Sequence, residues 1–341
     1  MNMNELFEYK DDNTGYVIRQ FTDSKERSHK FYYTTESFTA DDKYFFYRRD
    51  TDNGKSALYR VEYATGHQEL ALTDEYSHMC LDYNSSFAFA RKGDGLYRLD
   101  TATGKIDEVG AFPAGECKGH LSVSKSGLVW CSYQQANKIY ALLVIDPKTG
   151  KHEIVWQDDH FLNHCQACPG DDETVMYVHE TGGDALQRIW MFDYPTRTVR
   201  PYFVEKEGDW ITHEVWTADG EYLYFVRYPN HIMRGTRDGH SFKSVAQSTQ
   251  FLHCAPDRSG KWLAADRVTG VYRGWKNQIT LVNAETGVEH VLANLEEPNT
   301  GAEHPHPSFN RVGNVVLFNK PIDKGFCNVC AIDLSQVPVF K

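Results

Sequence analysis

Short apolar runs alternate with polar turns along almost the whole chain. The runs are rich in aromatic and β-branched residues, and Gly, Asp or Asn bounds each of them, which is the pattern of β-strands. Convincing amphipathic helical periodicity is almost absent. The pattern therefore predicts an all-β protein built from many short strands.

One unit of this pattern recurs seven times from about residue 30 to the end of the chain. It contains an apolar or aromatic run, a polar turn, a second aromatic run, and a strand that ends in a turn resembling Asp-x-x-Thr-Gly. Clear copies of this turn lie at residues 100–104, 146–150 and 283–287. The first turns of successive copies are about 40 to 53 residues apart, which is typical of four-stranded propeller blades.

We therefore expect residues 1–341 to fold as a single seven-bladed β-propeller. A further strand, at about residues 15–21, precedes the first copy. We expect this strand to complete the last blade, because closing the ring in this way protects the edges of the sheets.

Composition and charge narrow the possible partners. The 36 basic and 47 acidic residues give a net charge of −11, which argues against a nucleic-acid binder that relies on a basic surface. The first residues have neither a basic start nor an apolar run, and no segment approaches the roughly 18 apolar residues that span a membrane. We expect a cytoplasmic protein with neither a nucleic-acid nor a membrane partner.

The eight cysteines fit reduced thiols in that compartment. Two C-x-x-C pairs occur, Cys165/Cys168 and Cys327/Cys330, and two such pairs can indicate structural zinc. However, residues 327–330 have the pattern of a strand, in which residues three apart point to opposite faces. The two pairs also lie far apart in the sequence, so structural zinc is disfavoured.

Histidines recur in phase with the repeats. In a propeller the first strand of each blade lines the central channel, and the residues just before these strands surround one mouth of it. We expect five of these histidines to precede the first strands and to face one funnel, namely His78, His120, His164, His213 and His253, although histidines at such junctions can also simply cap the backbone. The phased histidines are His29, His78, His120, His164, His213 and His253.

The last repeat opens with two histidines, His304 and His306. Residues two apart in an extended segment point the same way, and Pro305 and Pro307 bias this segment away from helix. His253, from the preceding blade, is the natural third ligand. Three imidazoles with open coordination positions suit a divalent Mn, Fe, Ni or Zn ion that also binds substrate oxygen.

At these residues the chain resembles the oligogalacturonate lyases, cytoplasmic seven-bladed propeller enzymes of pectin breakdown. The resemblance implies a divalent cation, typically Mn²⁺, held by His253, His304 and His306. It also implies His213 as the general base and Arg188 as an assisting residue, in β-elimination on short oligogalacturonates, which are small anionic oligosaccharides. The segments that carry the resemblance are residues 178–180, 187–190, 212–216, 252–253 and 304–309.

One position departs from the family pattern. The family supplies a glutamine as fourth metal ligand, three residues before the first histidine of the His-Pro-His segment, and this chain has Gly301 there. Water, Glu303 or Asn299 could complete the coordination instead, or the chain could prefer another metal or uronide.

Other interpretations stay open at this point. Arg188 could form a structural ion pair with a nearby acid, and His213 could cap the backbone. The protein could also be a non-catalytic Tol-type propeller that binds a sugar or a protein. A metal-dependent propeller hydrolase would need carboxylates around the channel, yet the blade heads carry His more often than Asp or Glu. Substrate binding and simple filling of the funnel are both open for His29, His78, His120 and His164.

Overall fold

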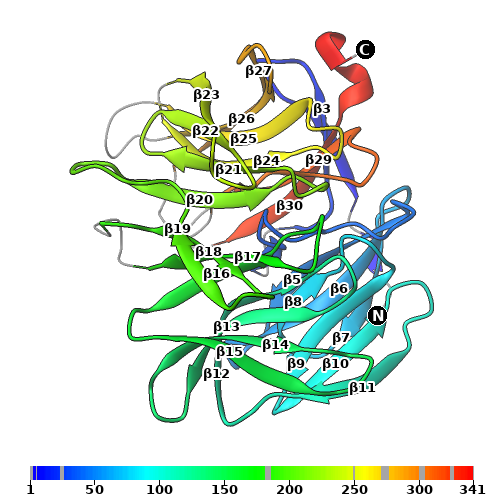
Figure 1. Cartoon of the computed structure of the whole chain (residues 1–341). Helices are drawn as coiled ribbons and strands as arrows, with labels where there is room; N and C mark the ends of the chain where they lie inside the picture. The colour runs from blue at the N-terminus through cyan, green and yellow to red at the C-terminus, as the bar shows by residue number, and fades with distance from the viewer. Residues whose placement is uncertain are drawn as a thin grey trace.

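Seven sheets, five of four strands and two of five strands, surround a central axis in the computed structural model (Figure 1). The chain is therefore all-β with seven propeller blades, as the sequence predicts. Two 3-10 turns, η1 (Leu334–Gln336) and η2 (Pro338–Phe340), follow the last strand. The structure describes residues 3–4, 6–23, 27–180, 186–248, 250–269, 276–298, 304–322 and 326–340.

Blades 1 to 4 follow one another along the first two thirds of the chain, and each runs from its innermost to its outermost strand. Blade 1 contains β4 (Ser28–Lys30), β5 (Tyr44–Asp50), β6 (Ser56–Glu62) and β7 (His67–Leu72). Blade 2 contains β8 (Ser77–Leu81), β9 (Phe87–Lys92), β10 (Gly95–Asp100) and β11 (Ile106–Ala111). Blade 3 contains β12 (Gly115–Val123), β13 (Val129–Gln135), β14 (Tyr140–Ile145) and β15 (His152–Asp158). Blade 4 contains β16 (Leu162–Ala167), β17 (Thr174–His179), β18 (Ile189–Asp193) and β19 (Thr198–Pro201).

Blades 5 to 7 complete the ring, and the last of them combines both ends of the chain. Blade 5 contains β20 (Ile211–Trp216), β21 (Tyr222–Arg227), β22 (His231–Thr236) and β23 (Phe242–Gln247). Blade 6 contains β24 (Phe251–Pro256), β25 (Trp262–Thr269), β26 (Lys276–Asn283) and β27 (Glu289–Pro298). Blade 7 contains β28 (Ser308–Phe309), β29 (Val315–Pro321), β30 (Cys327–Asp333), β3 (Val17–Gln20) and β2 (Phe7–Lys10).

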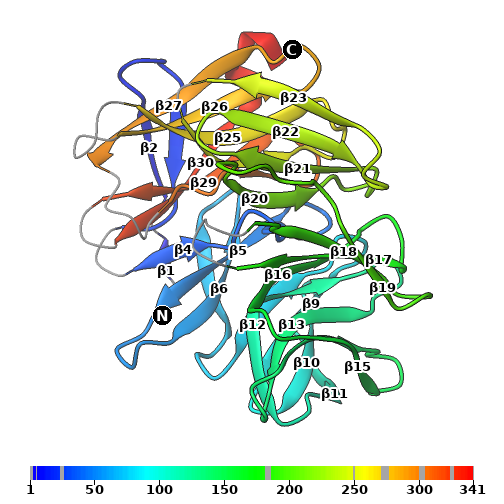
Figure 2. The same cartoon turned by 60° about the vertical axis from the view of Figure 1, so that its left-hand side comes forward.

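The N-terminal strands lie outside the C-terminal ones in blade 7. Strand β3 pairs antiparallel with β30, with Ile18 opposite Ile332, and β2 then pairs with β3. Figure 2 shows blue β2 on the same side of the molecule as red β29 and β30, from which β3 separates it in the sheet. The short strand β1 (Met3–Asn4) extends blade 1 by pairing with β7. Hydrogen bonds between the two ends of the chain thus close the ring without leaving the edge of β30 exposed.

The core is divided into seven apolar clusters, one between each pair of neighbouring blades. Trp130, for example, is fully buried between blades 3 and 4. Because each sheet packs against a neighbour on both faces, its central strands are apolar on both faces. This explains why the sequence shows continuous apolar runs, such as those of β13 and β21, rather than strict alternation.

Truncating Ile18 should destabilise the ring measurably. Ile18 is 2% exposed and packs between blades 6 and 7. We expect Ile18→Ala to lower the free energy of unfolding by about 2–5 kcal/mol, because it removes buried methyl groups and leaves a cavity. Denaturant titration measures this loss, and Val312→Ala is the control because Val312 is 75% exposed. Equal stability of the two variants would contradict a stabilising role for the closing strand.

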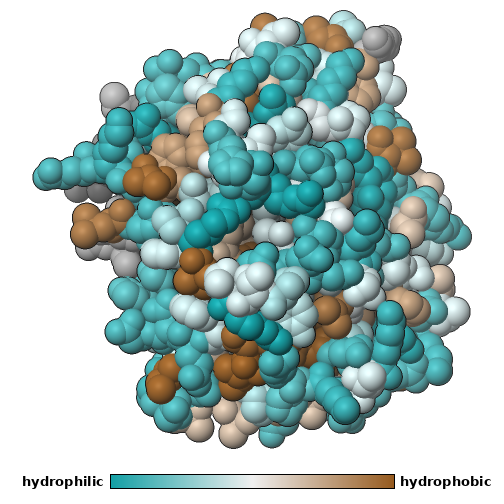
Figure 3. All heavy atoms as spheres, in the orientation of Figure 1, coloured by the Kyte–Doolittle hydropathy of each residue, from teal (hydrophilic) through white to brown (hydrophobic). Residues whose placement is uncertain are grey.

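The face drawn in Figure 3 is mostly hydrophilic, with apolar residues in small separate patches. Among the described residues, no helix has the length and apolar character needed to cross a membrane. All eight cysteines are buried. Cys165 packs between blades 3 and 4, whereas Cys168 packs between blades 4 and 5, so the two cysteines belong to different apolar clusters. In the part of the chain that the structure describes, no cysteine belongs to a group that could hold a metal ion.

Candidate active site

Residues 31–43 connect β4 to β5, and Tyr32 and Tyr33 in this connection reach across the central channel to distant blades. Tyr33 belongs to the cluster between blades 5 and 6, far around the ring from its own blade. The ring of Tyr32 lies 5.7 Å from that of His120, 5.9 Å from that of His164 and 4.8 Å from that of His306. Tyr32 therefore contacts blades 3, 4 and 7 and forms the floor of a histidine-lined funnel.

The histidines of the funnel sit at irregularities in the innermost strands. The pairing register shifts between Asn163 and Gln166 in β16 and between Thr212 and Val215 in β20. His164 and His213 lie inside these shifts and have left-handed backbones, with φ of 48° and 60°. A bulge of this kind removes one residue from the ladder and turns its side chain in a new direction.

The prediction that these histidines precede the first strands is therefore wrong in detail. His78, His120, His164, His213 and His253 lie within β8, β12, β16, β20 and β24. A bulge lets hydrogen bonding resume on both sides of the displaced residue, so each strand begins earlier than its apolar run suggests. In β20, Thr212 pairs with Val226 before the bulge and Val215 pairs with Tyr224 after it.

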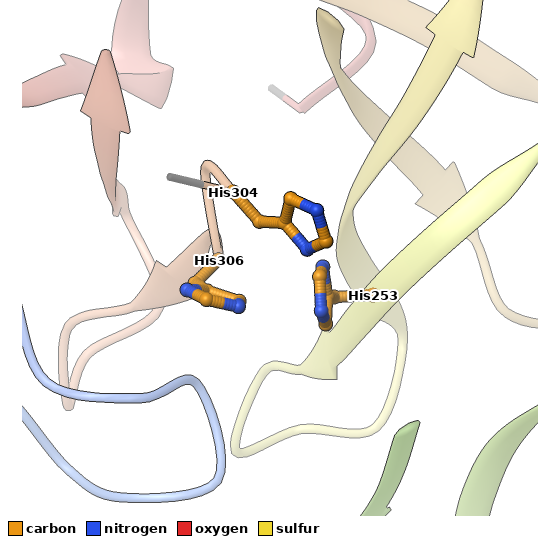
Figure 4. Close-up of side chains that lie close together, drawn as sticks. All are labelled: His253, His304 and His306. Atoms are coloured by element: carbon orange, nitrogen blue, oxygen red, sulfur yellow. The ribbon is translucent and has the colours of Figure 1, made fainter. Parts of the chain in front are cut away.

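Three of the predicted site residues converge in space. His253 comes from β24, and His304 and His306 come from the segment before β28 (Figure 4). One nitrogen from each of these imidazoles lies within 4.8 Å of the other two. The ring of His253 is 4.2 Å from that of His306 and 5.2 Å from that of His304. The geometry thus brings three imidazole donors to one point, the arrangement of a three-histidine metal site.

Asp266 on β25 orients His253. Both carboxylate oxygens of Asp266 lie 3.0 Å from Nδ1 of His253, and Oδ1 also accepts the backbone N–H of His253 at 2.7 Å. Both side chains are almost completely buried. With Nδ1 directed at the carboxylate, Nε2 is left for a metal ion, which is the usual carboxylate–histidine–metal arrangement. Burial raises the pKa of Asp266 to about 7.

The His-Pro-His segment is held by blades 1 and 7. The buried ammonium group of Lys30 donates to the carbonyl of His306 at 2.8 Å. The side chain of Asn319 donates to the carbonyl of His304 at 3.3 Å, and its backbone N–H donates to the carbonyl of Pro305 at 2.8 Å. Burial lowers the pKa of Lys30 to about 7. These bonds fix the backbone of a segment in which His306 has a φ of 46°.

His213 lies directly beside the three-histidine group. Its ring centre is 4.1 Å from that of His253. Its Nδ1 is buried and has no hydrogen-bond partner among the described residues, so this atom caps no backbone group. Burial, reinforced by the neighbouring His253, His304 and Arg188, lowers the pKa of His213 well below its usual value. The imidazole is therefore neutral near pH 7 and able to accept a proton.

Arg188 is 5% exposed and lies between two carboxylates. Its Nε donates to Glu214 at 2.7 Å, and its Nη1 donates to Glu180 at 3.0 Å. Glu180 also lies 3.2 Å from Nε2 of His164. The hydrogen bond from His164 and the charge of Arg188 outweigh burial and hold the pKa of Glu180 at about 2. Arg188 thus forms the structural ion pair that was considered for it. Because Glu214 directly follows His213 in β20, this ion pair also connects Arg188 to the strand that carries His213.

The other phased histidines have different surroundings. Nδ1 of His78 lies 2.7 Å from the carbonyl oxygen of Gly119, a contact that joins blades 2 and 3. His120 and His164 lie against Tyr32, and His29 lies on β4. The positions considered for a fourth metal ligand, Asn299, Gly301 and Glu303, lie outside the described residues.

Comparison with known proteins adds independent information about this site. The family model described as oligogalacturonate lyase matches residues 129–256. An oligogalacturonide lyase of Pectobacterium atrosepticum is 27% identical over 236 residues, which are 61% of this chain and 59% of that protein.

Two solved structures have the same fold over nearly their whole length. An oligogalacturonate lyase in complex with manganese has a TM-score of 0.87 at 21% identity, covering 100% of this chain and 99% of that one. An oligogalacturonate lyase from Vibrio parahaemolyticus has a TM-score of 0.86 at 18% identity, covering 98% of each chain. The chain is similar to oligogalacturonate lyases in part of its sequence and in its whole fold.

The likeness to the oligogalacturonate lyases includes part of the funnel. The region that matches the lyase family model contains Arg188, His213 and His253, whereas His304 and His306 lie beyond it. The sequence match spans 59% of the length of the Pectobacterium lyase. The fold extends the likeness to the whole ring, including the last blade.

Sequence reasoning missed Asp266 and Tyr32. Asp266 could have been found, because His253 and Asp266 are equally far from the centre of residues 257–262 and pair across the hairpin. Tyr32 carried no comparable signal. Its segment has no counterpart in the other repeats, and its importance depends on passing through the channel.

Proposed function

We propose that this protein is a metal-dependent lyase that cleaves short oligogalacturonates by β-elimination. The observation that carries the proposal is the convergence of His253, His304 and His306 on one point, with the neutral His213 beside them. The relationship to oligogalacturonate lyases supports the substrate class, and the manganese complex of one relative supports a divalent ion.

The donor set fits such an ion. Metal ligands must be unprotonated, and burial lowers the pKa values of His253 and His306 well below their usual values. Asp266 holds the tautomer of His253 that leaves Nε2 free. His253, His304 and His306 would hold Mn²⁺, which would supply positive charge to the uronate carboxylate and so favour loss of the neighbouring proton.

His213 and Arg188 would carry out the remaining steps, which are proton removal and stabilisation of negative charge. The proton to be removed lies on C5 of the uronate, next to a carboxylate that is already negative. His213 would accept it, because its imidazole is neutral and its Nδ1 has no competing partner among the described residues. Arg188 keeps N–H groups beyond the three that bind Glu214 and Glu180, and these would stabilise negative charge on the substrate. Loss of the O4 glycosidic oxygen would give a 4,5-unsaturated product.

The test is to incubate the protein and Mn²⁺ with digalacturonate and trigalacturonate. We expect ultraviolet absorbance from the conjugated double bond to rise, and excess chelator to abolish the rise. A hydrolase would release reducing ends without this absorbance, and a binding module would bind the sugars without cleaving them. Absence of absorbance with every uronide tried, in protein shown to contain metal, would refute the lyase proposal.

A further inference from the structure

A second group of potential metal ligands lies between blades 3 and 4, apart from the three-histidine group. Asp158 ends β15, His160 lies in the connection to β16, and His179 ends β17. Each of these residues offers one ligand atom, and the three atoms lie within 4.8 Å of one another. No residue of this group belongs to the candidate active site.

The distances within this group match metal coordination. Nδ1 of His160 is 2.9 Å from Oδ1 of Asp158, and Nε2 of His179 is 3.1 Å from Oδ2 of the same carboxylate. The two imidazole rings are stacked, with centres 4.3 Å apart and planes at 8°. Donors about 2.0–2.2 Å from one zinc ion lie about 3 to 3.5 Å from each other, so small side-chain rotations would let all three reach it.

The charge around these ligands also favours a cation. Asp159 brings a second carboxylate, with Oδ1 3.1 Å from Nδ1 of His160. Among the described residues, no lysine or arginine forms an ion pair with Asp158 or Asp159. Two carboxylates therefore meet two imidazoles without a compensating side-chain cation.

The surroundings provide a rigid wall and an entry path. The side chains of Asp158 and His179 are 13% and 10% exposed, and the ring of Trp190 lies 5.1 Å from that of His179. His160 is 59% exposed, so an ion could enter from solvent on its side.

We propose that Asp158, His160 and His179 form a second metal site, specific for a divalent ion that favours imidazole, such as Zn²⁺. Asp159 or water would complete the coordination. A carboxylate that only received hydrogen bonds from two histidines would show similar distances, and the experiment must separate the two cases. The proposal is independent of the lyase activity.

The experiment is equilibrium dialysis of tag-free protein against Zn²⁺, with bound metal counted by mass spectrometry. We expect His160→Gln and His179→Gln each to bind one ion fewer per chain than the wild type. His240→Gln is the matched control, because His240 also pairs with one carboxylate, Asp238, at 2.9 Å but has no second imidazole there. This control should bind as many ions as the wild type.

A second variant separates this site from the three-histidine group. The double variant His253→Ala/His160→Gln should bind one ion fewer than His253→Ala alone. This holds whether or not the three-histidine group binds zinc. Equal numbers of ions in the wild type and His160→Gln would overturn the proposal, as would an equal loss in His240→Gln. Since His160 is largely exposed, its replacement leaves the core intact, and circular dichroism verifies the fold.

Discussion

His213→Ala should lower kcat on digalacturonate by about a hundred- to ten-thousand-fold, the range for removing a general base. Nδ1 of His213 is buried without a partner among the described residues, so the structure offers no other role for that atom. Because His213 is a neighbour of the three-histidine group and not part of it, bound Mn²⁺ should remain. The measurement is steady-state kinetics together with metal content.

His231→Ala is the matched control, since His231 lies on β22 of the same blade and contacts Ser244 away from the channel. The pH profile gives a second readout. Burial and the charges of neighbouring groups lower the pKa of His213, so the base form is lost only when the pH falls well below about 6.5. Full activity of His213→Ala, with metal present, would refute the assignment of His213 as the base.

Asp266→Asn should weaken Mn²⁺ binding by about 10- to 100-fold, the usual effect of losing a carboxylate that orients a ligating histidine. The substitution keeps the size of the side chain but replaces one acceptor oxygen by an amide donor. His253 would then lose one of its two contacts at Nδ1 and its fixed tautomer. Calorimetric titration with Mn²⁺ measures the effect.

The control for this variant is Asp257→Asn. Asp257 is also buried and also accepts a backbone N–H, that of Trp262 at 3.0 Å, but it lies in the turn at the far end of β24. Excess Mn²⁺ should restore much of the activity of Asp266→Asn, because the defect is in affinity. An unchanged affinity for Mn²⁺ would show that Asp266 does not orient a metal ligand.

The number of blades and the class of fold were predictable because both depend on local patterns. Strand length, turn residues and the spacing of repeats are set by neighbours in the sequence, and each blade repeats the same pattern of strands and turns. Even the approach of His304 and His306 to His253 followed from the order of the blades, since consecutive blades are neighbours in space.

The positions of the histidines within their strands were less predictable. A bulge at His164 or His213 leaves the apolar pattern on both sides intact, so nothing in the pattern marks where the ladder is interrupted. The backbone adopts a left-handed conformation there although the residue is not glycine. Packing around the channel decides this conformation, and the apolar pattern of the sequence does not indicate it.

The sequence by itself determined seven similar blades, closed by strand pairing between the chain ends, and a histidine at almost every blade head. Tertiary structure decided which of these histidines meet. The passage of Tyr32 through the channel, the ion pairs of Arg188 and the approach of Asp266 to His253 all join groups whose partners are chosen by packing. The physical reason is that a repeat pattern specifies each blade locally, whereas a site on the axis depends on side chains from several blades and on the one segment that does not repeat.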